Sequence, residues 1–185
     1  MLFRSKEPYR LEGKKTMGLE LAEQLGWTTP DVLLYPTGGG TGLVGIAKAY
    51  EELAAMGWLS GTLPRFVSVQ AEGCAPIVRA WAEGAETAAP WENPVTHAAG
   101  LRVPAPLGDR LVLRALRESG GDAESASEDE IREYTSRLSH STGIDAAPEG
   151  GAALCATAKL VRQGRPSAES EVVVYNTGSG ASYRQ

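Results

Sequence analysis

The chain has 185 residues, of which 42% are hydrophobic and 22% are charged, as in an ordinary globular protein with a sizeable core. Its formal net charge of −5 argues against a nucleic-acid or anionic-membrane partner. No apolar run approaches the roughly 18 residues that span a bilayer, so we expect no membrane association and a cytoplasmic location.

The start of the chain lacks regular patterning. Residues 1–9, MLFRSKEPY, show neither a helix start nor strand alternation, and we expect this stretch to be unstructured or an artefactual start. One domain is expected over residues 10–185. Its first helix is predicted over residues 17–25, where apolar residues recur at helical spacing before Gly26.

Short apolar runs and helical patterns then alternate along the chain. Strands are predicted at residues 31–35, 65–71, 122–126 (a weak edge strand) and 171–175. Helices are predicted at residues 41–56, 75–84, 108–121, 127–143 and 148–164. Ser127 and Glu130 form a capping-box pattern, and residues 86–107 carry four prolines and read as a loop. This alternation predicts an α/β fold, layered αβα, with a largely parallel sheet.

The cysteines and histidines give no sign of a metal or nucleophile site. Cys74 and Cys155 lie far apart in helical patterns, and we interpret them as two buried free thiols. His97 and His140 have no carboxylate, cysteine or serine at a recognisable catalytic spacing, so we expect surface histidines.

The most informative stretch is the glycine-rich turn between strand 31–35 and helix 41–56, with the sequence PTGGGTG. Such a turn presents backbone N–H groups and the positive end of a helix dipole, both of which favour an anion. Glycines allow the close backbone approach that a Cβ would block. We therefore expect a phosphate to bind here.

The sequence of the turn is compatible with several kinds of phosphate-bearing ligand. A nucleotide-triphosphatase loop is excluded because Gly-Lys-Ser/Thr is missing. Gly40, Gly42 and Gly45 fit the dinucleotide pattern G-x-G-x-x-G, but the expected acidic residue comes late, at Glu72. Strand 171–175 runs into a second turn, NTGSG, which either faces the same ligand or is simply a frayed end.

The blocks RLEGKKTMGLELAEQLGW, YPTGGGTGL, PRFVSVQAEGCAPIV, GLRVP, LRESGG, SEDEI, PEGGAAL and NTGSG together resemble the threonine synthases and their relatives. These are pyridoxal-phosphate enzymes of the tryptophan-synthase-β fold type. The resemblance begins at Arg10 and implies the C-terminal portion of such a lyase. It implies conversion of O-phosphohomoserine and water to threonine and phosphate in threonine biosynthesis, and a homodimer at full length.

The resemblance also implies roles for individual residues. Thr177 would hydrogen-bond the pyridine nitrogen of the cofactor, and Arg10 would contact the phosphate of a phosphorylated amino-acid substrate. Pro148 and Glu149 match a stretch that flanks the cofactor ring. The residues that would cradle the phosphate of pyridoxal 5′-phosphate are Gly38, Gly39, Gly40, Thr41 and Gly42.

The sequence departs from the family pattern in two places. The Schiff-base lysine of the family follows Ser-x, but Lys6, Lys14, Lys15, Lys48 and Lys159 do not lie in that motif. We therefore expect a truncated chain without a catalytic residue, inactive as written.

The second departure is Gly39, where family members with a well-described substrate-phosphate site carry asparagine. This keeps a related serine/threonine dehydratase or β-replacement enzyme open as an alternative. A non-catalytic phosphate- or dinucleotide-binding module is the alternative from another class.

Overall fold

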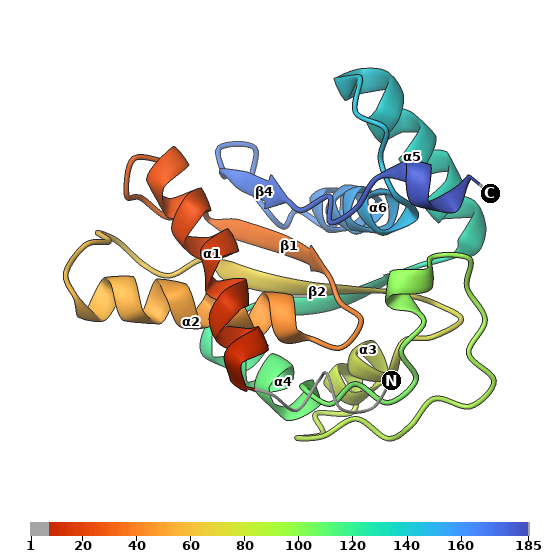
Figure 1. Ribbon diagram of the computed structural model, residues 1–185, viewed down its shortest axis with the longest axis horizontal. Helices are drawn as coiled ribbons and strands as arrows, with labels where there is room; N and C mark the ends of the chain where they lie inside the picture. Colours follow the sequence, from red (N-terminus) through yellow and green to blue (C-terminus); the bar gives the residue numbers. More distant parts are fainter. Residues whose placement is uncertain (1–7, 185) are drawn as a thin grey trace.

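The computed structural model describes residues 8–184 as four strands, six helices and two short 3-10 helices (Figure 1). The strands are β1 (Val32–Pro36), β2 (Arg65–Ala71), β3 (Asp122–Ala126) and β4 (Val172–Val174). The helices are α1 (Pro8–Gln24), α2 (Thr41–Ala55), α3 (Pro76–Ala82), α4 (Asp109–Glu118), α5 (Glu128–Thr142) and α6 (Pro148–Arg162). The 3-10 helices are η1 (Ala99–Leu101) and η2 (Gly180–Tyr183).

The four strands form one parallel sheet in the order β3-β2-β1-β4. Val32 of β1 is in register with Arg65 of β2 on one side and Val172 of β4 on the other. The chain therefore builds outward from β1 to β3 and then returns to the opposite side of β1. In open α/β sheets, ligands bind outside the carboxyl ends of the strands at such a reversal. Here that point lies between the ends of β1 and β4.

Helices cover both faces of the sheet, as the predicted αβα layering requires. Alternate residues of β1 enter two separate apolar cores: Leu33 and Tyr35 pack in one, Val32 and Leu34 in the other. Helices α1 to α4 contribute to the first core, and α5 and α6 to the second. Figure 1 shows α5 and α6 above the sheet and α2, α3 and α4 below it. The predicted α/β class is confirmed.

Helix α1 lies unusually close to α2 because small residues meet at their contact. A Cβ on Gly45 would lie 2.7 Å from the Cβ of Lys14, and one on Gly18 would lie 2.8 Å from the Cβ of Ala49. This approach places the first turns of α1 beside the start of α2.

The largest difference from the sequence prediction concerns α1, which begins at Pro8 rather than at residue 17. Its early turns carry little apolar pattern and are stabilised by ion pairs with α2, such as Lys15 Nζ to Glu52 Oε2 at 2.6 Å and Lys48 with Glu12. A local pattern cannot reveal partners on another helix. Pro8 and Tyr9, expected in the irregular start, lie in this helix, and residues 1–7 are outside the described part.

The remaining elements follow the predictions closely. The capping box at α5 is confirmed, with the Glu130 N–H donating to Ser127 Oγ at 3.3 Å and the Ser127 N–H to Glu130 Oε2 at 2.9 Å. Both cysteines are buried free thiols, but Cys74 lies in the turn after β2 and not in a helix. Across residues 8–184, no helix is long and apolar enough to cross a membrane.

Cys155, inside α6, gives the fold a dependence on alkaline pH. Burial, with the Glu130 carboxylate adding to it, raises the pKa of this thiol from 9.0 to about 11. Its stabilising contribution is therefore complete below pH 9 and is lost as the pH rises toward 11. The free energy of unfolding of the unmodified chain should fall between pH 9 and 11. In Cys155→Ala that fall should be smaller by on the order of 2 kcal/mol. Urea titrations in reducing buffer measure this; identical pH slopes for both proteins would contradict it.

Candidate functional site

A polar cavity of about 510 Å³ lies at the carboxyl ends of β1 and β4, where the strand order reverses. It is bounded by α1, by the turn that leads into α2, by the start of α6 and by the turn after β4. All seven residues that the sequence resemblance assigned to binding line it: Arg10, Gly38, Gly39, Gly40, Thr41, Gly42 and Thr177. Segments more than 130 residues apart in sequence therefore meet at one site.

We call the turn after β1, Gly38 to Gly42, the phosphate cradle, after the group that we expect from the sequence to bind there. Gly40 adopts the left-handed φ of 88° at the N-cap of α2 and makes no side-chain cap hydrogen bond, so no side chain competes for the first N–H groups of the helix. A Cβ on Gly38 would lie 2.2 Å from the Gly100 carbonyl oxygen, whereas one on Gly39 would meet no atom within 4 Å. The cradle is closed beneath Gly38 and open at Gly39, which fits an anionic oxygen group.

The turn after β4 is held in place by the segment before α6. The Ala147 N–H donates to the Gly178 carbonyl at 3.3 Å, and the Gly180 N–H donates to the Asp145 carbonyl at 2.9 Å. The turn is thus an ordered wall of the cavity, and the alternative of a frayed end is wrong. Next to Thr177, the buried Asn176 Oδ1 packs against α6, where a Cβ on Gly150 would lie 2.3 Å from it.

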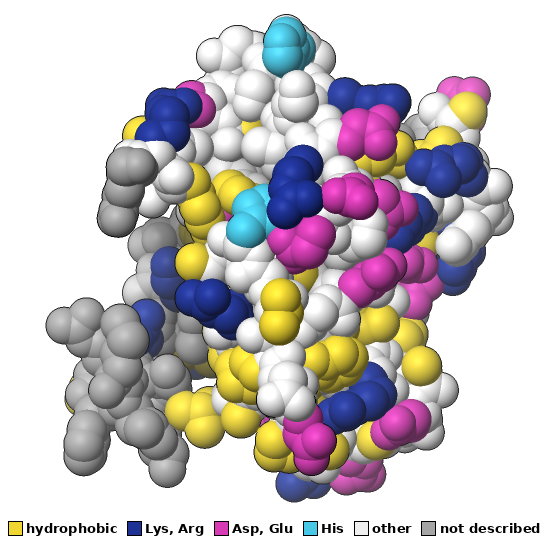
Figure 2. All heavy atoms as spheres, turned by 90° about the vertical axis from the view of Figure 1, so that its right-hand side faces the viewer, with side chains coloured by type: hydrophobic (Ala, Val, Ile, Leu, Met, Phe, Trp, Pro, Cys, Tyr) yellow, Lys and Arg dark blue, Asp and Glu magenta, His cyan; other side chains and the backbone are white. Residues whose placement is uncertain are grey.

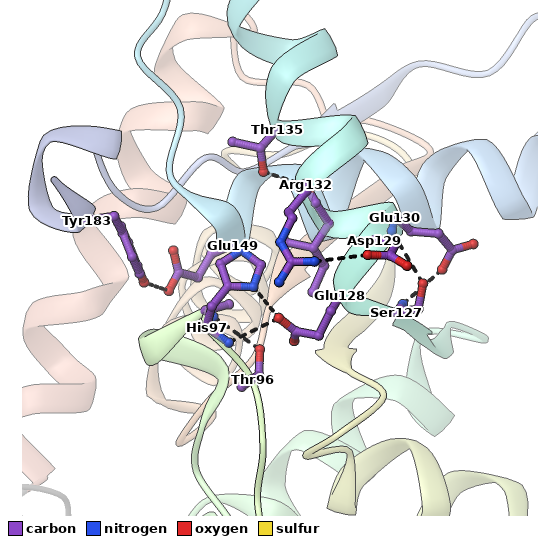
Figure 3. A network of polar contacts seen from close by, with 12 residues as sticks. Thr96, His97, Ser127, Glu128, Asp129, Glu130, Arg132, Thr135, Glu149 and Tyr183 are labelled. Atoms are coloured by element: carbon purple, nitrogen blue, oxygen red, sulfur yellow. Dashed lines mark hydrogen bonds and ion pairs between the residues drawn. The ribbon is translucent and has the colours of Figure 1, made fainter.

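Glu149, at the second position of α6, is a buried carboxylate in the cavity wall. Its Oε1 accepts a hydrogen bond from the Gly100 N–H at 2.8 Å and another from the Tyr183 hydroxyl. Burial, together with this hydrogen bond, raises the pKa of Tyr183 to about 12, so the hydroxyl keeps its proton at neutral pH. Figure 3 shows the Tyr183 ring and the Glu149 carboxylate pointing toward each other.

Two cationic side chains of α1, Arg10 and Lys14, lie one helical turn apart on the cavity wall. The other described lysines pair with carboxylates elsewhere: Lys15 and Lys48 with the α1–α2 glutamates, and Lys159 with Glu130 at 2.8 Å. The cavity therefore offers positive charge opposite the carboxyl ends of the strands. This arrangement suits an anionic ligand group in addition to the one at the glycine turn.

Lys14, Gly100 and Tyr183 are cavity residues that sequence reasoning missed. Lys14 follows Arg10 by four residues, so a helix extended back to Pro8 would have placed both on one face. For Gly100 and Tyr183 the sequence contains no comparable signal, because each contributes through a contact with a residue more than 30 positions away.

Two of the four residues behind the dinucleotide alternative, Gly45 and Glu72, lie outside the cavity lining. Gly45 serves the contact between α2 and α1, and Glu72 follows β2, so neither supports a dinucleotide site here. His97 and His140 are exposed, as predicted. His97 does have a carboxylate partner, however: its Nδ1 and its backbone N–H both contact Glu128 at the start of α5 (Figure 3).

Charged side chains are intermingled on the face seen in Figure 2, where acidic and basic groups lie next to one another without an extended patch of either sign. This distribution agrees with the modest net charge of −5. On this face of the described residues, no continuous basic track of the kind that nucleic-acid backbones require is seen.

An open parallel sheet with a polar cavity at its switch point defines the class: a ligand-binding α/β protein. Residues 2–178 match the sequence model of the family described as pyridoxal-phosphate dependent enzyme. This chain therefore belongs to that family.

Curated relatives point in the same direction. Threonine synthase of Methanosarcina acetivorans is 38% identical over 96% of this chain and 44% of the relative. Threonine synthase of Methanocaldococcus jannaschii is 33% identical over 97% of this chain and 44% of the relative. The chain thus spans less than half the length of these curated relatives. The resemblance to threonine synthases that the motifs indicated is confirmed.

Solved structures with the same fold include enzymes of other names. A threonine deaminase from the organism abbreviated T.th. superposes with a TM-score of 0.66 at 26% identity, over 90% of this chain and 58% of that one. A threonine deaminase from Solanum lycopersicum superposes with a TM-score of 0.72 at 18% identity, over 91% of this chain and 45% of that one. At 18% identity the second comparison shows the fold alone.

Proposed function

We propose that these residues form the part of a threonine synthase that binds the cofactor and the substrate. The observation that carries the proposal is the meeting of the glycine turn, Thr177 and Arg10 on one cavity. The glycine turn would hold the cofactor's phosphate through backbone N–H groups. Arg10, with Lys14 beside it, would hold the phosphate of O-phosphohomoserine.

Pyridoxal phosphate, when bound, supplies an electron sink for substrate carbanions. The Thr177 hydroxyl would donate a hydrogen bond to the pyridine nitrogen. Because a hydroxyl is neutral, it leaves that nitrogen largely unprotonated, whereas a carboxylate would favour a proton there. Thr177 would therefore moderate the electron sink.

We propose no covalent role for the lysines described here. Lys15, Lys48 and Lys159 are held in ion pairs away from the cavity. Lys14 lies on α1 beside Arg10, where its charge suits an anion. The lysine that the family uses to hold its cofactor would come from polypeptide outside these 185 residues, so this chain alone would bind but not catalyse.

Ligand titration tests the binding part of this proposal. Pyridoxine 5′-phosphate carries the cofactor's ring and phosphate but no aldehyde, so it cannot react with surface lysines. We expect it to bind the chain more tightly than NAD does in isothermal titration calorimetry. Tight binding of NAD with no response to pyridoxine 5′-phosphate would instead support the dinucleotide-binding module.

The catalytic part is tested on a polypeptide that carries these residues at the length of the curated relatives. We expect it to release inorganic phosphate and threonine from O-phosphohomoserine. Formation of ammonia from serine or threonine, without use of the phosphorylated substrate, would favour the dehydratase. Gly39 is the observation that keeps this second function in view, since it offers no side chain to a substrate phosphate.

Arg10→Gln is expected to weaken binding of the phosphorylated substrate by about 10- to 100-fold, the usual worth of a hydrogen bond to a charged group. Binding of pyridoxine 5′-phosphate should change little, because its phosphate is assigned to the glycine turn. Arg110→Gln, on the exposed face of α4, removes the same charge away from the cavity and is the matched control. If Arg10→Gln and Arg110→Gln weakened substrate binding equally, the loss would come from the change in net charge and not from a contact of Arg10 with the substrate.

A further inference from the structure

One carboxylate oxygen joins three separate segments of the cavity wall. Glu149 belongs to α6, Gly100 to η1 and Tyr183 to η2, and the Gly100 N–H and the Tyr183 hydroxyl both donate to Glu149 Oε1 (Figure 3). The Glu149 residue is 6% exposed, so solvent competes little for this oxygen.

Each of the two donors is tied to a different end of the cavity. Gly100 lies directly beneath the glycine turn, because its carbonyl oxygen would be only 2.2 Å from a Cβ on Gly38. Tyr183 lies in η2, which directly follows the turn that carries Thr177 and begins at an N-cap where Ser179 Oγ accepts from the Ala181 N–H at 3.2 Å. Glu149 thus connects the floor of the phosphate cradle to the wall that carries Thr177.

We propose that Glu149 is a positioning residue that sets the separation between the phosphate cradle and Thr177. The inference rests on the proposed function, since it assumes that one ligand reaches both places. A rigid ligand that contacts both ends gains from both only when their separation matches its own length. The affinity of a ligand that contacts one end alone does not depend on that separation.

Three ligands separate these cases. Inorganic phosphate probes the anion sites at the cradle and at Arg10, neither of which depends on the separation. Pyridoxine probes the ring site, and pyridoxine 5′-phosphate requires the cradle and the ring site at the correct separation. In isothermal titration calorimetry of the 185-residue chain, we expect Glu149→Leu to weaken pyridoxine 5′-phosphate by about tenfold or more, since misplacement by about 1 Å is costly. Binding of inorganic phosphate and of pyridoxine should stay within about twofold, the scatter of uncoupled sites.

Conservative variants distinguish positioning from a general loss of structure. Glu149→Gln keeps an oxygen that can accept from both donors and should restore binding of pyridoxine 5′-phosphate. Tyr183→Phe removes one of the two donors and should give a smaller but equally selective loss. Tyr134→Phe is the matched control, because its hydroxyl accepts from Arg162 on the outer face of α5 and α6.

Amide hydrogen exchange gives a second readout that needs no ligand. The Gly100 N–H should exchange faster in Glu149→Leu than in the unmodified chain, because it loses its acceptor. If Glu149→Leu does not fold, Tyr183→Phe and Glu149→Gln carry the selective-binding test. Equal weakening of all three ligands, or no weakening of pyridoxine 5′-phosphate, would overturn the positioning role. Failure of the unmodified chain to bind any of the three would overturn the proposed function itself.

Discussion

Replacing Gln70 by leucine is expected to lower the free energy of unfolding by about 3 kcal/mol or more. Gln70 lies near the end of β2 with its side chain fully buried. Its Nε2 donates to the Thr37 carbonyl at 3.1 Å, and its Oε1 accepts from the Ile77 and Val78 N–H groups at 2.8 and 3.2 Å. Leucine would leave three backbone groups without these partners, two of them buried and the Val78 N–H partly buried, and each buried one costs about 1–3 kcal/mol.

Gln70 also has a functional consequence because Thr37 directly precedes the glycine turn. Without the hydrogen bond from Gln70, the Thr37 backbone that leads into the phosphate cradle is no longer held in position. Inorganic phosphate should therefore bind more weakly to Gln70→Leu. Ser68→Ala is the matched control in the same strand: Ser68 is equally buried, but its hydroxyl has no partner, so its removal should leave stability unchanged or slightly raised. Urea denaturation of both variants measures the difference, and similar losses would contradict the assigned role of Gln70.

The second large effect is expected at Gly38. A Cβ there would lie 2.2 Å from the Gly100 carbonyl oxygen and 3.0 Å from Val103 Cγ2, so backbone must move to admit it. Overpacking of this kind typically costs about 1–3 kcal/mol. Because the displaced segments are the phosphate cradle and η1, we expect Gly38→Ala to lose inorganic phosphate binding as well as stability. Thermal denaturation and phosphate titration measure the two effects.

Gly39→Ala is the matched control for Gly38→Ala. The neighbouring residue has open space where a Cβ would be added, with no atom within 4 Å. Its unfolding free energy should therefore stay close to that of the unmodified chain. A loss of stability at Gly39 as large as at Gly38 would show that the turn itself, and not its contact with η1, limits the substitution.

Local patterns were sufficient for most elements of the fold. The buried runs of β1 and β2, the glycine that opens α2 and the Ser127–Glu130 box of α5 each act within a few residues, so a short window contains the whole cause. The first turns of α1 were missed because their stabilising partners, Glu52 and Lys48, belong to α2.

Some features of the candidate site likewise follow from local sequence, and others depend on contacts between distant residues. The sequence by itself determined that a glycine turn between a strand and a helix presents N–H groups to an anion, because backbone geometry and the helix dipole are local properties. The motif resemblance added Thr177 and Arg10 as residues of the same binding site.

Only the tertiary structure decided how these parts meet. The placement of β4 beside β1 brings Thr177 to the glycine turn, and the approach of α1 to α2 adds Lys14. The shared Glu149 oxygen links residues 49 and 34 positions away in sequence. Such contacts depend on packing across the sheet and on the burial of a carboxylate, and neither property can be read from residues that are neighbours along the chain.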